Sequence, residues 1–288
     1  MTAKRSTPAS PEALKLLERF PALQAVLDQC YMVKFGGAAM EQDSVRDAVC
    51  RELALLSQLG ASIIVVHGGG KEITRLLERL SIESRFIDGV RVTSTAAMVA
   101  TEMVLSGLVN KDLASRITRY GAPAVGISGR DAQLIEAVPY RNQALDDFGE
   151  TGDLHACNLG LIHALVAGGY VPVVSPVGES KDGAAKNLNA DLAAAGLAGS
   201  LKAVKAIFLT DVAGVKIDKS VQPSLTTQDV KKLISSGIIT GGMIPKVECA
   251  IKALVDGCPS AMICDASGLN IVTRAILGET TAGTVITN

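Results

Sequence analysis

The stretch IIVVHGGGKEI, Ile63 to Ile73, places three consecutive glycines between an apolar run and a helix-like segment. The β-branched residues before His67 predict a buried strand, and the residues from Lys71 onward have helical spacing. Glycine permits positive φ and brings backbone N–H groups close to an anion, while the following helix N-terminus adds its dipole. We therefore interpret this turn as a candidate phosphate or carboxylate site, although a tight turn can also need glycine for its geometry alone.

The same rhythm of short apolar runs and helical segments continues along the chain. Helices are expected at residues 41–59 and 71–80, among others. Strands rich in β-branched residues, separated by helices of about ten or more residues, favour a mainly parallel sheet covered on both faces, so we predict an α/β fold. The expected strands lie at residues 31–35, 62–67, 122–128, 170–178, 205–214 and 260–266.

The composition is that of an ordinary globular protein with small partners. The 288 residues are 48% hydrophobic and 20% charged, with a formal net charge of -1, which gives no electrostatic case for nucleic acid or an anionic membrane. The six cysteines show no C-x-x-C pair, so neither zinc nor a disulfide framework is indicated. The basic, acid-free first ten residues hint at a transit peptide but are too short, and no apolar run reaches the length of a membrane span, so we expect a cytoplasmic protein.

The domain organisation is expected to comprise an N-terminal extension and two lobes. Residues 10–29 open with Ser and Pro and continue with helical apolar spacing, which predicts one helix, or two broken at Pro21. No linker rich in Pro, Gly or Ser divides the rest. We place the junction near Gly199, which gives a helical extension at 1–30, one lobe at 31–198 and a second lobe at 199–288.

Four glycine-bearing turns follow expected strands, at residues 34–38, 67–71, 126–131 and 209–215. The carboxyl ends of parallel strands meet at one edge of a sheet, where ligands bind. The coincidence of four such turns favours an anion site more than any single turn does. Two well-known phosphate signatures fail: Ile73 occupies the third glycine position of the Rossmann pattern, and Glu72 follows the Gly-Lys of a would-be Walker A motif.

Two lysines stand where a solvated lysine would be out of place. Lys34 ends an apolar strand directly before Gly36 and Gly37. Lys246 follows the turn GGMIP at the start of a helix, where its charge is unfavourable beside the positive end of the helix dipole. A bound anion would explain both positions; exposure of the lysine to solvent is the alternative for each.

Further polar side chains lead into predicted helices or follow turns. The segment NLNAD brings Asn187, Asn189 and Asp191 in front of an Ala-rich helix, and one of them is expected to be the N-cap. Arg91 follows a Gly turn, and its guanidinium could grip a carboxylate in bidentate fashion or form a surface ion pair. We assign no catalytic base to His67, which we interpret as shaping its turn, and no nucleophile to Ser128, since G-I-S-G does not match G-x-S-x-G.

These motifs together resemble the amino acid kinase family. The segments VKFGGAAM, VVHGGGKEI, DGVRVTS, LVNKDLASRI, GISGRDAQLI, GYVPVVSPVG, NLNADLAAAGLAG, FLTDVAGV and GGMIPKVECAIKAL occur in the order and spacing of that family, from about Tyr31 to Asp265. The chain looks most like the family's acetylglutamate kinases. The resemblance implies a three-layer α/β/α sandwich around a mainly parallel sheet, with the amino-acid substrate in the N-terminal lobe and ATP in the C-terminal lobe.

The resemblance also implies roles for individual residues. Lys34 and Lys246 would hold the phosphates and neutralise the transferring group, with Asp191 orienting both lysines. Backbone N–H groups of four glycines would bind the phosphoryl oxygens, and Arg91 and Asn187 would hold the acylated amino acid. The four glycines are Gly36, Gly37, Gly69 and Gly70, and the nucleotide pocket would include Thr210, Asp211, Gly214, Gly242 and Met243.

The implied reaction is transfer of a phosphoryl group from ATP to the γ-carboxylate of N-acetyl-L-glutamate, in arginine biosynthesis. A carboxylate is already ionised at neutral pH, so no general base is required. Positioning and electrostatic stabilisation would carry the rate enhancement, with Mg²⁺ arriving on the nucleotide and no separate metal site in the protein.

Several expectations remain open at this point. The resemblance implies a homo-oligomer, a dimer or a hexamer joined through the N-terminal helix, and a possible PII-type regulator. Arginine inhibition is in question, because the C-terminal segment keeps Gly283-Thr284 but lacks the rest of the effector pattern. The alternative functions are a kinase for an amino acid on a carrier protein and a regulatory pseudokinase. A Rossmann dehydrogenase already fails its fingerprint.

Overall fold

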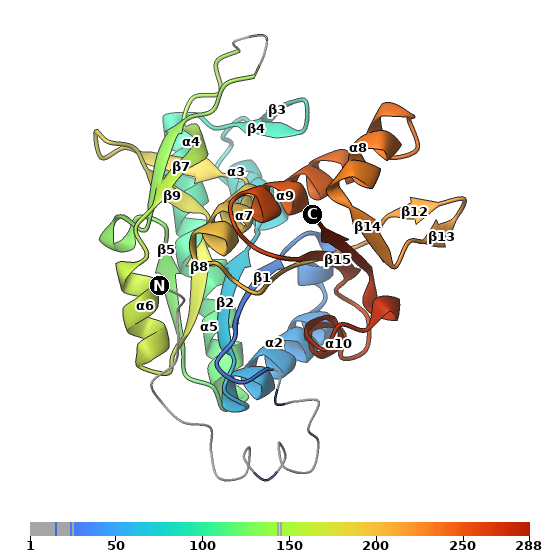
Figure 1. The fold of residues 1–288 in the computed structure, drawn as a ribbon. Coiled ribbons are helices and arrows are strands. Elements are labelled where there is room, and N and C mark those ends of the chain that lie inside the picture. Colours follow the sequence, from blue (N-terminus) through green and yellow to red (C-terminus); the bar gives the residue numbers. More distant parts are fainter. Residues whose placement is uncertain (1–14, 16–23, 25, 143, 145) are drawn as a thin grey trace.

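The fold is described from a computed structural model, in which residues 15, 24, 26–142, 144 and 146–288 are placed well enough to discuss (Figure 1). The helix expected at residues 10–29 lies almost wholly outside this described part. The core of the molecule is a single eight-stranded sheet with helices on both sides. The α/β class predicted from the sequence is confirmed.

The central sheet is parallel apart from one edge. The strands β11, β1, β2, β8 and β5 run parallel to one another and to β15, whereas β16 runs antiparallel to β15 and parallel to β14. Only this edge departs from the predicted parallel arrangement. In spatial order the strands are β14 (Ser224–Thr226), β16 (Thr284–Thr287), β15 (Ala261–Asp265), β11 (Lys205–Thr210), β1 (Cys30–Phe35), β2 (Ser62–His67), β8 (Val171–Ser175) and β5 (Ala124–Ser128).

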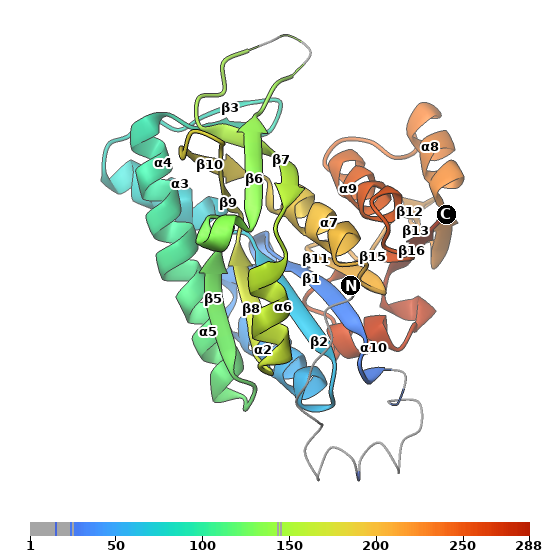
Figure 2. The same cartoon turned by 60° about the vertical axis from the view of Figure 1, so that its left-hand side comes forward.

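Helices cover both faces of this sheet (Figure 2). On one face lie α2 (Asp43–Gln58), α3 (Gly70–Arg79), α4 (Thr95–Glu102), the π-helix η3 (Met103–Val109), α5 (Asn110–Arg119) and α10 (Ile271–Ile276). On the other face lie α6 (Gly160–Ala167), α7 (Ala190–Ser200), α8 (Thr227–Ser235) and α9 (Met243–Val255). Each face buries its own apolar cluster, as a strand with alternating side chains requires.

Strand β1 shows how this alternation positions the candidate site. Val33 and Phe35 belong to the apolar cluster under α2 and α5, whereas Cys30 and Met32 belong to the cluster under α7 and α9. Lys34 continues the series of residues 30 and 32, so its side chain lies on the α7 side. The period of two therefore delivers a lysine to the N-terminal end of α7 without any special backbone geometry.

A smaller β layer and two hairpins lie beside the main sheet. The layer is a closed barrel of β6 (Ile135–Pro139), β7 (Thr151–Cys157), β9 (Val177–Glu179) and β10 (Ala185–Leu188). The hairpins are β3 (Arg85–Ile87) with β4 (Val90–Val92), and β12 (Lys216–Ile217) with β13 (Ser220–Val221). The sequence analysis did not anticipate the barrel, because its strands are short and pair across long stretches of sequence.

The predicted division into lobes stays a prediction. Gly199 lies inside α7, and β1 of the first lobe pairs with both β2 and β11, so the main sheet is continuous across the expected junction. The six cysteines all lie in the described residues, are free, and are buried apart from Cys157, which is half-buried. No helix in the described part of the chain has the length and apolarity needed to cross a membrane.

A buried carboxylate links α2 to α10 at the far end of the molecule from the strand carboxyl ends. Glu52 of α2 accepts a hydrogen bond from the backbone N–H of Thr273, 2.9 Å away, at the first turn of α10. Burial raises the pKa of the Glu52 carboxyl, and the N–H groups at the start of α10 partly offset that effect. Since the unfolded chain then loses this proton at a lower pH than the folded chain, ionisation of Glu52 reduces stability as pH rises through that interval.

We expect Glu52→Ala to lower the free energy of unfolding by about 1–3 kcal/mol, because it leaves the N–H groups of α10 unpaired. Glu52→Gln keeps an oxygen acceptor and removes the charge, so it should match or exceed the wild-type stability at pH 7. Urea unfolding of the three proteins at pH 5 and pH 7 measures this. Equal losses in both variants would contradict the role given to the acceptor oxygen.

Candidate active site

The carboxyl ends of β1 and β2 are adjacent and open directly into two glycine turns. In the ladder Lys34 pairs with Val66 and Phe35 with His67, and the N–H of Gly68 continues the pairing by donating to Phe35 O at 2.9 Å. The KFGG and HGGG turns therefore leave the sheet side by side. This edge is where a parallel sheet binds its ligands.

Lys34 and Asp191 form an ion pair at the centre of this edge. Lys34 Nζ lies 2.9 Å from Asp191 Oδ1, and the two side chains are 8% and 22% exposed. Asp191 is in the first turn of α7, where Asn189 is the N-cap and its side chain accepts from the N–H of Asp191 and Leu192. The prediction that one residue of the NLNAD segment caps the helix is confirmed for Asn189, which leaves the Asp191 carboxylate for the lysine.

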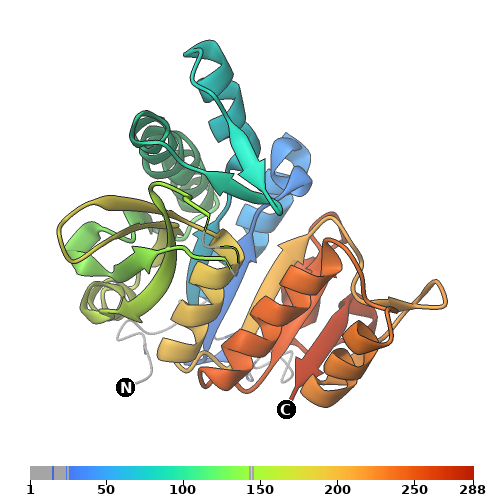
Figure 3. The same ribbon diagram turned by 90° about the horizontal axis from the view of Figure 1, so that it is seen from above.

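Lys246 lies in the first turn of α9, which packs beside α7 (Figure 3). The Asp211 carboxyl, just past the end of β11, has a lowered pKa, mainly through its own backbone N–H and also through the charges of Lys246 and Lys34. Both lysines are thus close enough to Asp211 to act on the same carboxylate. In the described residues no ion pair joins Lys246 to Asp191 or to any other carboxylate, so its charge has no partner within the chain.

The four glycines singled out from the sequence present unused backbone donors. Within the described part of the chain, none of the N–H groups of Gly36, Gly37, Gly69 and Gly70 donates a hydrogen bond to the protein. Gly36 and Gly69 are buried residues, and buried N–H groups are rarely left without an acceptor. Gly70 also begins α3, whose N-terminus adds a favourable dipole. Together they form a ready site for an anion.

Gly36 must be glycine for a steric reason. A Cβ at this position would lie 2.8 Å from Lys34 Nζ and 3.3 Å from the backbone nitrogen of Gly68. Gly37, next to it, has φ 77°, in the left-handed region. The turn therefore needs its first glycine for close approach to the lysine and its second for the chain direction.

Arg91 lies at the opposite end of the glycine loop, on β4. Its Nη2 donates to Gly70 O at 3.0 Å and to Thr74 Oγ1 at 2.8 Å, its Nη1 donates to the hydroxyl of Ser84, and the guanidinium stacks 4.6 Å from the centre of the Phe86 ring. Burial lowers the pKa of Arg91. The Nε–H and one Nη1–H remain for a ligand, and no carboxylate in the described part of the chain pairs with this buried charge.

A cavity of about 520 Å³ joins these groups. Its lining includes Gly69, Gly70, Arg91 and Asn187 together with residues from the first turns of α7 and α9. Asn187, on β10, donates from its Nδ2 to Thr93 Oγ1 at 3.1 Å. The sequence analysis missed Thr93, Thr151, Phe86 and Tyr140, which come from the barrel and the hairpin; the motif DGVRVTS held a signal for Thr93 alone.

The residues expected at the nucleotide lie around the end of β11 and the start of α9. Thr210 is buried, with its hydroxyl donating to Asp211 and accepting from the N–H of Val212. Gly214 has φ 139°, and a Cβ there would lie 2.6 Å from Thr284 Oγ1. Gly214 and Met243 line a separate hollow of about 210 Å³ with Val212, Lys216 and Thr240, and Gly242 is the N-cap of α9.

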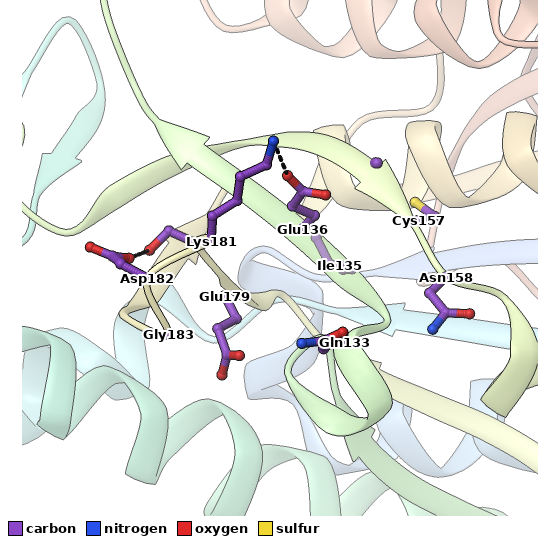
Figure 4. Close-up of a pocket in the computed structure, with 11 residues that line it drawn as sticks. Gln133, Ile135, Glu136, Cys157, Asn158, Glu179, Lys181, Asp182 and Gly183 are labelled. Atoms are coloured by element: carbon purple, nitrogen blue, oxygen red, sulfur yellow. Dashed lines mark hydrogen bonds and ion pairs between the residues drawn. The ribbon is translucent and has the colours of Figure 1, made fainter.

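No group of three or more His, Cys, Asp or Glu side chains in the described residues could hold a metal ion. The largest cavity, of about 710 Å³, lies over β6, β7 and β9 and contains none of the residues discussed so far. Glu136, Glu179, Lys181 and Asp182 line it, and Lys181 Nζ lies 3.6 Å from Glu136 Oε1 (Figure 4). Its carboxylates make it unsuited to an anionic ligand.

His67 ends β2 and is fully buried under the glycine loop. Its Nδ1 lies 2.8 Å from Gly68 O, and since a carbonyl only accepts, Nδ1 carries the proton. Nε2 is then the acceptor for Asn110 Nδ2 at 3.1 Å. Because a peptide unit is planar and trans, fixing the Gly68 carbonyl directs the Gly69 N–H the opposite way.

We expect His67 to stay neutral across the pH range in which the protein is folded. Burial lowers its pKa to about 4, the charge of Lys111 acts in the same direction, and the hydrogen bond to Gly68 opposes both. The ¹⁵N shifts of the imidazole should show a protonated Nδ1 and an unprotonated Nε2 from pH 5 to pH 9. A histidine that titrates near pH 6.5 and is lost in His67→Gln would contradict this tautomer and its role in the loop.

Comparison with solved structures places this fold among known enzymes. N-acetylglutamate synthase from Neisseria gonorrhoeae, complexed with coenzyme A and N-acetyl-glutamate, is similar with a TM-score of 0.83 at 20% identity, over 97% of this chain and 64% of that one. This chain therefore spans slightly under two thirds of the synthase. The protein smu.665 from Streptococcus mutans UA159 has a TM-score of 0.73 at 29% identity, over 90% of this chain and 98% of that one.

A kinase is also among the similar structures. Carbamate kinase from Giardia lamblia bound to AMP-PNP has a TM-score of 0.66 at 16% identity, covering 90% of this chain and 98% of that one. The model of the amino acid kinase family matches residues 29–265, which include every strand and helix that contributes to the crevice. The chain belongs to the amino acid kinase family.

Proposed function

We propose that the protein transfers the γ-phosphoryl group of ATP to the γ-carboxylate of N-acetyl-L-glutamate, giving N-acetyl-L-glutamyl 5-phosphate. Membership of a kinase family supports phosphoryl transfer as the class of reaction. The similar structures support its two ligands, since the Neisseria synthase was solved with N-acetyl-glutamate and the Giardia kinase with AMP-PNP. A role in arginine biosynthesis and a cytoplasmic location belong to the same proposal.

The observation that carries the proposal is that anion-binding groups without acceptors or counter-ions lie at both ends of one crevice. Arg91 is buried without a carboxylate at one end, and the glycine N–H groups beside Lys34 have no acceptor at the other. An uncompensated buried charge is costly, so each end is completed by a bound anion. A dicarboxylate whose far end meets the γ-phosphate of ATP satisfies both ends at once.

The chemistry follows from these positions. A γ-carboxylate oxygen forms a bond to the γ-phosphorus as the bond to the β-phosphate bridging oxygen breaks, and ADP leaves with that electron pair. No proton moves, because the nucleophile is already ionised. Lys34, Lys246 and the glycine N–H groups would stabilise the charge on the transferring group, and Asp191 would hold Lys34 in place. Mg²⁺ would arrive with the nucleotide phosphates and neutralise part of their charge, and Asp211 lies near enough to the lysines to meet it.

We expect hydroxamate to form from ATP, Mg²⁺ and hydroxylamine only with N-acetyl-L-glutamate, and not with L-glutamate, aspartate or carbamate. Lys246→Ala should lower kcat on the order of 100-fold or more, because a preorganised charge is lost. No hydroxamate from a folded protein that binds ATP would reject the proposal in favour of a carrier-bound substrate or a regulatory role.

Gly36→Ala offers a second test of the same crevice. The new methyl group would displace the flexible end of Lys34 rather than the backbone, so we expect kcat to fall by about 10- to 100-fold while the melting temperature changes little. The matched control is Gly160→Ala in α6, whose Cβ would make an ordinary contact at 3.4 Å. Unchanged turnover in Gly36→Ala would remove Lys34 from the phosphoryl site.

Two expectations about partners stay predictions that rest on the family resemblance. One is a homo-oligomer, a dimer or a hexamer, and the other is a PII-type regulator. The exposed apolar side chains of Val99, Met103 and Leu108 on α4 and η3 support the first. The N-terminal helix that would join dimers lies outside the described residues.

A further inference from the structure

Two buried threonines connect the backbone of Arg91 to the side chain of Asn187. Thr151 Oγ1 lies 2.6 Å from Arg91 O, Thr93 Oγ1 lies 2.9 Å from Thr151 Oγ1, and Asn187 Nδ2 lies 3.1 Å from Thr93 Oγ1. Thr93 is fully buried and Thr151 is 5% exposed, so solvent does not compete for these bonds. The chain thus joins the two residues assigned to the acylated amino acid.

The direction of every bond in this chain follows from counting hydrogens. The Arg91 carbonyl only accepts, so Thr151 uses its one hydroxyl hydrogen there. Thr93 must then donate its own hydrogen to Thr151. Thr93 can therefore only accept from Asn187, which requires the NH₂ group of that amide, and not its oxygen, to face Thr93.

This order settles which atom Asn187 offers to the cavity. Its backbone is fixed by an N–H bond to Glu150 O at 2.8 Å, and its side chain lines the same cavity as Arg91. In the described residues no group donates to Asn187 Oδ1. The cavity therefore presents a hydrogen-bond acceptor at Asn187 near a cationic donor at Arg91.

We infer that Thr93 and Thr151 are positioning residues that hold the Asn187 oxygen toward the substrate and so select an N–H group next to a carboxylate. The inference rests on the proposed function and deepens it by naming what distinguishes the acceptor substrate. An α-amido carboxylate offers its carboxylate to Arg91 and its N–H to Asn187. An analogue with an ester oxygen in place of that N–H would face the Asn187 oxygen with a second acceptor, which is repulsive.

The test compares N-acetyl-L-glutamate with (S)-2-acetoxyglutarate, its ester analogue, by calorimetric titration and by steady-state kinetics. We expect wild type to prefer the amide by about 10-fold or more, the difference made by one hydrogen bond and one unpaired acceptor. Thr93→Val keeps the shape of the side chain but frees the Asn187 amide to turn, so the preference should fall to about threefold or less. Thr93→Ser restores the hydroxyl and should restore the preference, and the KM for ATP should stay within about twofold throughout.

A readout that needs no substrate separates this inference from the proposed function. The side-chain amide signals of Asn187, assigned by their loss in Asn187→Asp, should shift in Thr93→Val and return in Thr93→Ser. If wild type neither binds nor phosphorylates N-acetyl-L-glutamate, the proposed function fails, and these signals alone decide whether the threonines orient the amide. Unchanged signals in Thr93→Val, or an equal loss of preference in Thr93→Ser, would overturn the inference.

Discussion

The ion pair between Lys34 and Asp191 is the interaction on which the arrangement of the crevice depends. It forms because β1 alternates its side chains between two apolar faces and ends with a lysine on the face covered by α7, whose first turn carries the carboxylate. A largely buried pair of this kind adds little net stability, since loss of hydration offsets most of the attraction. Its effect is to hold a cationic amine at the ends of the central strands, where Gly36 leaves room for it.

The rest of the site consists of polar groups that the chain leaves incomplete. Elsewhere the described interior is well satisfied: His67 uses both ring nitrogens, and Glu52 accepts from the start of α10. Along the crevice the opposite holds for the glycine N–H groups, for the charge of Lys246 and for the charge of Arg91. Unpaired groups are costly, so their concentration along one edge of the sheet indicates function rather than fold stability.

Much of the fold and part of the site could be predicted from sequence, for identifiable physical reasons. The strand runs and the glycine turns are local patterns, so the parallel sheet and the meeting of Gly36 with Gly68 followed from periodicity and strand order. The barrel could not be predicted, because β7 and β10 pair across more than thirty residues and carry no motif. The same limit hid Thr93 and Thr151, whose contact with Asn187 exists only after the barrel closes.

The most direct measurement of the central claim is a crystal structure of the protein with ADP, Mg²⁺, aluminium fluoride and N-acetyl-L-glutamate. The account requires the fluoroaluminate to lie between Lys34, Lys246 and the N–H groups of the glycine turns, in line with the γ-carboxylate, while Arg91 contacts the other carboxylate. Finding the amino acid in the cavity of Glu136 and Asp182, or the fluoroaluminate away from the glycine turns, would contradict it.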